Sequence, residues 1–148
     1  MEWAGIPWGS MSIADPHPAA DFDLWADTYD HEVTSEGSFP FEGYSRVLDT
    51  VVSLAEPKPG MQVIDLGVGT GNLAARFHKA GCRLWCTDFS ALMLEKARRR
   101  LPHAEFILHD LRTSFPANLP RPFDLVVSTY VFHHFPQKEK MTLCSHLV

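Results

Sequence analysis

The stretch VIDLGVGTGNLAARF, which runs from Val63 to Phe77, decides the fold that the rest of the chain can take. It begins with a short apolar run, continues with three glycines within five positions, and closes with a helical pattern. This order is typical of a strand, a tight turn and a helix in a parallel α/β sheet. Ligands bind such sheets beyond the carboxyl ends of the strands, where glycine admits a close backbone approach and a helix offers free N–H groups. The turn therefore predicts a ligand site.

The three glycines do not form the usual phosphate-binding patterns. A dinucleotide-binding turn has the pattern G-x-G-x-x-G, but here Asn72 occupies the sixth position after Gly67. A P-loop requires G-K-[ST], which the stretch lacks. Asp65 stands just before the turn, where a carboxylate would repel a pyrophosphate but would attract an ammonium or sulfonium group.

Outward from this stretch, strand-like runs alternate with helical patterns. The expected strands cover 61–66, 83–88, 105–110 and 123–130. The expected helices cover 22–29, 44–55, 72–81, 91–101 and 137–148, while the connection 111–122 is rich in proline. This alternation predicts an α/β fold: a Rossmann-like, doubly wound, mainly parallel sheet with N-terminal helices.

Acidic residues also end the second and third expected strands. Asp88 follows Asp65 by 23 residues, the place from which a carboxylate can accept hydrogen bonds from a ribose diol. Asp110 could accept a hydrogen bond from an adenine amino group, and the apolar Phe89 and Met93 could flank the adenine ring. Each acid alone could be a turn or helix cap. Together with the glycine turn they favour a nucleoside-containing ligand.

At these residues the chain resembles the class I S-adenosylmethionine-dependent methyltransferases of the small-molecule type. The resemblance covers Phe22 to Phe135 and includes the segments FDLWADTYD, VIDLGVGTGNLAARF, LWCTDFSALMLEKARRR, FILHDL and FDLVVSTYVFHHF. It implies the cofactor S-adenosyl-L-methionine and a small-molecule substrate.

The resemblance also implies where the cofactor binds. Asp65 and the backbone of Gly67 and Gly69 would hold its amino-acid end, and Asp88 would take the ribose hydroxyls. The remaining cofactor-binding candidates are Tyr29, Thr70, Gly71, Phe89, Met93, Asp110, Leu111, Ser128 and Thr129.

The catalytic residues stay open. Methyl transfer needs chiefly alignment and a dry pocket, with a general base if the acceptor carries a proton. The candidates for this role are Tyr29, Asp30, His133 and His134. The two histidines could equally be loop residues, and adjacent histidines alone lack the further ligands of a zinc site, so no metal is expected. Trp25 and Tyr29 could be core residues of the first helix or a cover over the cofactor.

The family's sheet has seven strands, of which this chain provides four. We therefore expect a flexible tail over residues 1–20 and a methyltransferase domain over 21–148 that is truncated after the fourth strand. The sheet would be incomplete on its C-terminal side, so the fourth strand would become an apolar edge that a homodimer could cover.

Composition excludes several other classes. The chain has 148 residues and a formal net charge of -5, which disfavours a nucleic-acid partner. Its start lacks the basic and apolar regions of a secretory signal, and no run is long enough to span a membrane. Three cysteines without a C-x-x-C pair suggest a reducing compartment, so we expect a cytoplasmic protein.

Three functions compete. The first is a methyltransferase that acts on a small molecule, whole or truncated. The second is a non-catalytic module that binds S-adenosylmethionine or a partner, and the third is a Rossmann oxidoreductase, which Asn72 disfavours.

Overall fold

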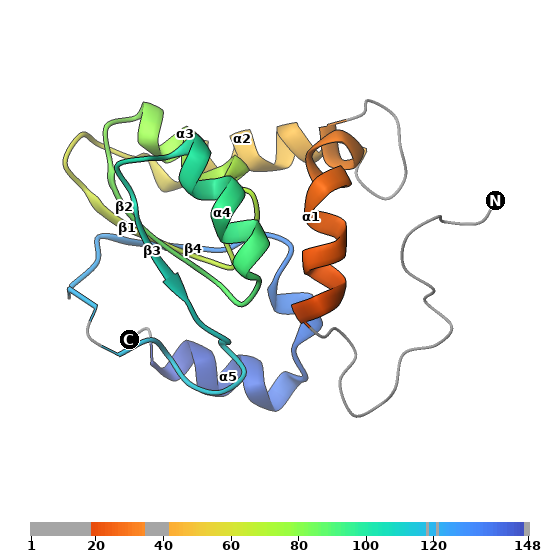
Figure 1. Cartoon of the computed structure of the whole chain (residues 1–148). Coiled ribbons are helices and arrows are strands. Elements are labelled where there is room, and N and C mark those ends of the chain that lie inside the picture. Colours follow the sequence, from red (N-terminus) through yellow and green to blue (C-terminus); the bar gives the residue numbers. More distant parts are fainter. Residues whose placement is uncertain (1–18, 35–41, 118, 121, 147–148) are drawn as a thin grey trace.

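The computed structural model describes residues 19–34, 42–117, 119–120 and 122–146. Its centre is a four-stranded parallel sheet in the order β3-β2-β1-β4 (Figure 1). The strands are β1 (Gln62–Leu66), β2 (Arg83–Asp88), β3 (Glu105–Leu108) and β4 (Leu125–Val127). This topology confirms the predicted Rossmann-like α/β fold. The predicted tail lies almost wholly outside the described residues.

The helices follow the expected order. They are α1 (Ala19–Thr34), α2 (Tyr44–Ala55), α3 (Asn72–Lys79), α4 (Ala91–Arg100), the short 3-10 turn η1 (Phe132–His134) and α5 (Gln137–Ser145). Helix α4 shows why the sequence forms these elements locally. The Ser90 hydroxyl caps it by accepting a hydrogen bond from Met93 N at 3.1 Å, and its last turn carries three arginines that suit the negative end of the helix dipole.

The core lies between the sheet and the helices that cross over it. Val63 on β1 and Leu84 and Cys86 on β2 pack against Phe77 of α3 and Leu94 of α4, and all five are buried. Helices α2, α3 and α4 lie over one side of the sheet in Figure 1, while α5 and the connection from β3 to β4 lie on the other side. This packing places the glycine turn and the ends of β1 and β2 at one edge.

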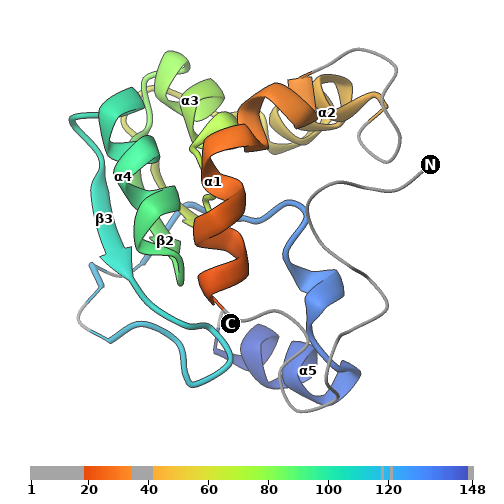
Figure 2. The same ribbon diagram turned by 45° about the vertical axis from the view of Figure 1, so that its right-hand side comes forward.

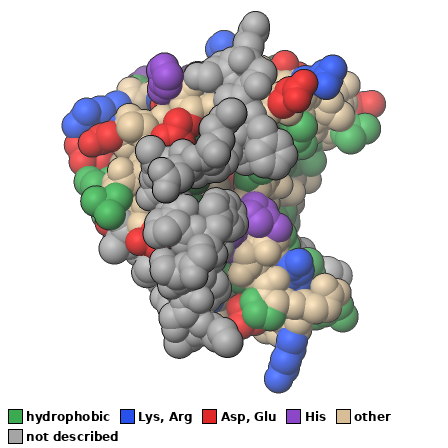
Figure 3. All heavy atoms as spheres, turned by 90° about the vertical axis from the view of Figure 1, so that its right-hand side faces the viewer, with side chains coloured by type: hydrophobic (Ala, Val, Ile, Leu, Met, Phe, Trp, Pro, Cys, Tyr) green, Lys and Arg blue, Asp and Glu red, His purple; other side chains and the backbone are tan. Residues whose placement is uncertain are grey.

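Helix α1 packs at this edge. It lies beside α4 in both ribbon views (Figure 1, Figure 2), with which it makes an ion pair of 3.0 Å between Asp27 and Lys96. On the face that Figure 3 shows, acidic and basic side chains stand close together rather than being separated by sign. None of the described helices is both long enough and apolar enough to cross a membrane.

The fourth strand is shorter than the pattern over 123–130 predicted. Its ladder with β1 covers Leu125 to Val127 and stops there, because the chain turns at Ser128, whose hydroxyl donates to Leu66 O at 2.7 Å. Tyr130 then adopts a left-handed backbone with φ 58°. β4 is an edge of the described sheet. That another chain pairs with this edge stays a prediction.

Candidate functional site

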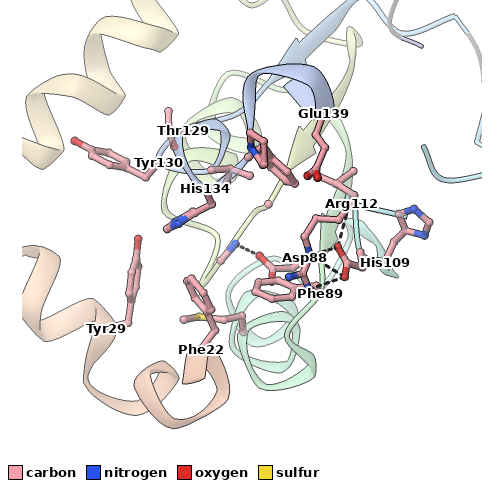
Figure 4. A pocket seen from close by; sticks show the side chains of 18 residues that line it. Phe22, Tyr29, Asp88, Phe89, His109, Arg112, Thr129, Tyr130, His134 and Glu139 are labelled. Atoms are coloured by element: carbon pink, nitrogen blue, oxygen red, sulfur yellow. Dashed lines mark hydrogen bonds and ion pairs between the residues drawn. The ribbon is translucent and has the colours of Figure 1, made fainter. Parts of the chain in front are cut away.

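A cavity of about 300 Å³ opens at the carboxyl ends of the strands (Figure 4). Its walls come from α1, the glycine turn, the loops after β2, β3 and β4, and the start of α5. Among the predicted site residues, those that line it are Tyr29, Gly67, Gly69, Asp88, Phe89, Met93, Asp110, Leu111, Thr129 and His134. Segments as far apart as α1 and α5 thus meet where the sequence predicted a ligand.

Six predicted residues do not line the cavity: Asp30, Asp65, Thr70, Gly71, Ser128 and His133. Asp65 and Thr70 are buried behind its wall, each with 1% of its surface exposed. Ser128 braces the loop after β4 through its bond to Leu66 O. His133 is exposed and stacks on His134, with 3.9 Å between the ring centroids.

The glycine turn needs its glycines for two different reasons. Gly67 has φ 76°, and a Cβ there would stand 2.3 Å from Cγ2 of Val131, so this glycine permits close packing of the loop after β4. Gly69 has φ 54°, and among the residues that the structure describes no atom beyond its chain neighbours would lie within 4 Å of a Cβ there. Because Gly69 lines the cavity, that open space is available to a ligand.

Asp88 ties the glycine turn to the loop after β2. Its Oδ2 accepts a hydrogen bond from Gly69 N at 2.8 Å, and its Oδ1 accepts one from Ser90 N at 2.9 Å. Burial raises the pKa of Asp88, although these N–H groups partly offset the shift. Each carboxylate oxygen has a second lone pair, so Asp88 can still accept bonds from a ligand.

The hydrogen bonding of Asp65 differs from that of Asp88. Within the part of the chain that the structure describes, its buried Oδ2 finds no hydrogen-bond partner. Burial, with a smaller contribution from the charge of Asp88, raises the pKa of Asp65 to about 8. A carboxyl group in this position is stabilised either by a proton or by a positive charge nearby.

Asp110 is held by a neighbour in the same loop. Arg112 donates to both of its carboxylate oxygens, from Nε at 2.9 and 3.0 Å and from Nη2 at 2.7 Å, and these bonds hold the pKa of Asp110 below its ordinary value. The Arg112 guanidinium also lies 5.5 Å from the centre of the Phe89 ring. The cation therefore fixes Asp110 and Phe89 at one end of the cavity.

Aromatic side chains form the other end. Tyr29 contacts Trp25 edge to face at 4.7 Å and hydrogen-bonds with Tyr44. Burial raises the pKa of Tyr29, so its hydroxyl keeps its proton at neutral pH. Tyr130 stacks near Tyr44 at 5.2 Å, and His134 points toward this side of the cavity (Figure 4).

The sequence did not single out several lining residues. These are Phe22, His109, Arg112, Tyr130, Val131, Phe135, Pro136 and Glu139. Phe22 could have been found, because it shares a helix face with Tyr29 at a spacing of seven residues. Within the described part of the chain, His, Cys, Asp and Glu side chains form no group of three that could hold a metal ion.

Comparison with known proteins identifies the class. Residues 63–148 match the model of a family described as "Methyltransferase domain". The match covers more than half of the chain, so the chain belongs to the methyltransferase domain family.

Individual proteins agree with this assignment. An uncharacterized methyltransferase from Geobacillus sp. strain WCH70 is 38% identical over 122 residues, which cover 80% of this chain and 55% of that protein. Another uncharacterized methyltransferase, from Anoxybacillus flavithermus, is 39% identical over 123 residues, with 80% and 55% covered. The chain thus spans about half the length of the curated relatives it matches.

A solved structure shares the fold. The magnesium protoporphyrin IX methyltransferase of Synechocystis PCC 6803, crystallised with bound SAM, superposes with a TM-score of 0.66 at 25% identity. The alignment covers 84% of this chain and 67% of that one.

Proposed function

We propose that the chain binds S-adenosyl-L-methionine and acts in methyl transfer to a small molecule. The observation that carries the proposal is the pair of buried carboxylates, Asp65 and Asp88, on either side of a glycine turn whose Gly69 faces open space in the cavity. Two acids in one buried site favour a ligand with positive charge and disfavour a pyrophosphate. Membership of the methyltransferase domain family and the SAM-bound structural relative support the same conclusion.

The residues present fit this cofactor. Asp88 would accept from ribose hydroxyls, and the negative field of Asp65 would attract the cationic end of the molecule. Phe89, Met93 and Leu111 provide an apolar wall for the adenine ring, next to Asp110 as an acceptor. Gly69, Asp88 and the apolar wall line the same cavity.

Methyl transfer requires the protein chiefly to align the acceptor with the methyl group. The bound cofactor supplies an activated methyl group on a sulfonium sulfur. The aromatic end of the cavity, with Phe22, Tyr29 and Tyr130, would exclude water and orient the acceptor. His134 is the proposed general base, whereas Tyr29 keeps its proton at neutral pH and is therefore not proposed as the base.

A small molecule is the proposed acceptor because the cavity has a volume of only about 300 Å³ and is lined by side chains from both α1 and α5. The cytoplasmic location predicted from the cysteines belongs to this proposal, and the described cysteines are free thiols. A turnover screen would identify the acceptor.

Two measurements test the function. Calorimetric titration should show that the full chain binds S-adenosylhomocysteine and not NAD, and preference for NAD would establish an oxidoreductase instead. A screen of small-molecule acceptors with a radiolabelled methyl donor should then detect turnover. Binding without turnover across the screen would favour a non-catalytic module.

A further inference from the structure

Helix α1 carries two aromatic–acid pairs with a spacing of seven residues. They are Phe22–Asp23 and Tyr29–Asp30. Seven residues make about two helical turns, so both pairs lie on one side of α1. Both aromatic side chains line the cavity. Both acids bind a hydroxyl residue in a loop that follows a strand, which gives the helix two attachment points.

The first attachment is to the loop after β2. Asp23 Oδ1 accepts a hydrogen bond from the Ser90 hydroxyl at 2.5 Å and a longer one from Leu92 N at 3.3 Å. Ser90 donates its own backbone N–H to Asp88. Phe22 packs edge to face on Phe89, with centroids 5.0 Å apart. Asp23 therefore connects α1 to the loop that carries Asp88 and Phe89.

The second attachment is to the glycine turn. Asp30 Oδ1 accepts hydrogen bonds from the Thr70 hydroxyl at 2.5 Å and from Asn72 Nδ2 at 3.0 Å. Asp30 Oδ2 forms an ion pair of 2.8 Å with Arg100 of α4. Thr70 is 1% exposed and follows Gly69 directly, so Asp30 reaches the centre of the turn.

We infer that Asp23 and Asp30 form a two-point clamp, which closes α1 over the cavity and holds Phe22 and Tyr29 against the bound cofactor. They are positioning residues, because they act through these two aromatic side chains and through the two loops. The inference rests on the proposed function. Since each acid binds a loop that also shapes the cofactor site, the clamp should slow release of the ligand.

The same helix provides a matched control. Asp27 also joins α1 to α4, through an ion pair with Lys96, but its side chain is 90% exposed and it binds neither loop. Exposed ion pairs contribute little. Asp27→Ala therefore makes the same chemical change on the same helix without touching the clamp.

The test is the dissociation rate of S-adenosylhomocysteine from the full chain, measured by competition in stopped flow. Asp23→Ala and Asp30→Ala should each raise this rate by about tenfold, the loss expected when hydrogen bonds to a charged group disappear. Asp27→Ala should leave it within about twofold of the wild type. Hydrogen exchange should show that ligand protects α1 amides in the wild type and in Asp27→Ala, but less in the two clamp variants.

Conservative variants separate positioning from folding. Asp23→Asn and Asp30→Asn keep an amide oxygen that can accept from Ser90 or Thr70, so they should recover part of the slow release, and they serve as the test if an alanine variant fails to fold. Equal dissociation rates in the clamp variants and Asp27→Ala would overturn the clamp and leave the proposed function standing. Absence of ligand binding by the wild-type chain would overturn the proposed function itself.

Discussion

The ends of β1 and β2 carry the same residue type in two contrasting states. Asp88 at the end of β2 has both carboxylate oxygens bound to backbone N–H groups, those of Gly69 and Ser90. Asp65 on β1 is at least as deeply buried, yet in the described structure its Oδ2 has no partner. One acid therefore shapes two loops, while the other is stabilised only by binding a proton or a positively charged ligand.

The two acids therefore have different roles in the site: Asp88 holds the loops in place, and Asp65 acts through its charge. Asp88 positions the turn through short bonds, so removing it should affect every ligand that needs the turn. Asp65 acts over a distance by its field, so removing it should affect only ligands with a positive charge.

Gly69→Val should have the largest effect. Its side chain would occupy the open space of the cavity, and we expect the affinity for S-adenosylhomocysteine to fall by at least about 100-fold in calorimetric titration. Gly60→Val is the matched control, because Gly60 also has a left-handed backbone, φ 86°, and also has open space for a Cβ among the described residues, but does not line the cavity. Equal affinity in both variants would show that the turn is not the site.

Asp88→Ala should weaken S-adenosylhomocysteine by about 1.5–3 kcal/mol, the range for hydrogen bonds to a charged group. It should also lower the free energy of unfolding, since Gly69 N and Ser90 N lose their acceptor. Asp124→Ala is the control: Asp124 accepts from Gln62 N at 2.7 Å, at the amino end of β1. Chemical denaturation measures the stability of both variants, and titration measures their affinity for the ligand. An equal loss of affinity in Asp124→Ala and Asp88→Ala would refute the assignment.

Asp65→Asn should weaken the same ligand by only about fivefold, because it removes a field and no direct bond in the described structure. In the ligand-free protein, by contrast, the same substitution should stabilise the fold. A buried neutral amide avoids the desolvation cost of a buried carboxylate. The free energy of unfolding at pH 8 should therefore rise by about 1–3 kcal/mol. A loss of stability in denaturant titration would mean that Asp65 already has a favourable partner.

The smallest expected effect is a dependence on pH. Because burial raises the pKa of Asp65 from 3.8 to about 8, the folded chain holds a proton that the unfolded chain has lost between these values. Stability of the ligand-free protein should therefore fall as pH rises from about 4 to about 8 and level off above that. Affinity for S-adenosylhomocysteine should rise by about threefold in total between pH 6.5 and 8, as Asp65 ionises. Asp65→Asn should lack both trends in parallel titrations.

The sequence predicted one part of the site much better than the other. The turn after β1 and the acids after the strands follow from local patterns, since glycines and strand-terminal acids can be read along the chain. Other lining residues, such as Tyr130 and Glu139, come from segments that only tertiary packing brings to the cavity, and no local periodicity marks them. The fourth strand was predicted too long because residues typical of strands, such as Thr129 and Tyr130, follow Val127, whereas the pairing with β1 ends at Val127.

The sequence alone did not predict the contrast between the two acids either. Asp65 and Asp88 each end an apolar run, and nothing in their neighbours tells which one meets backbone N–H groups. The answer depends on the path of the turn, which brings Gly69 N to Asp88. Likewise the bond from Thr70 to Asp30 joins residues 40 positions apart.

The most direct test compares two ligands in two variants. Calorimetric titration would give the affinity ratio of S-adenosylhomocysteine to 5′-methylthioadenosine, which lacks the charged amino-acid end, in the wild type, Asp65→Asn and Asp88→Ala. We predict that Asp65→Asn lowers this ratio by about fivefold, because only the charged ligand binds more weakly. We also predict that Asp88→Ala weakens both ligands and leaves the ratio unchanged. An equal change of the ratio in both variants, or a wild-type chain that binds neither ligand, would contradict these roles of the two acids.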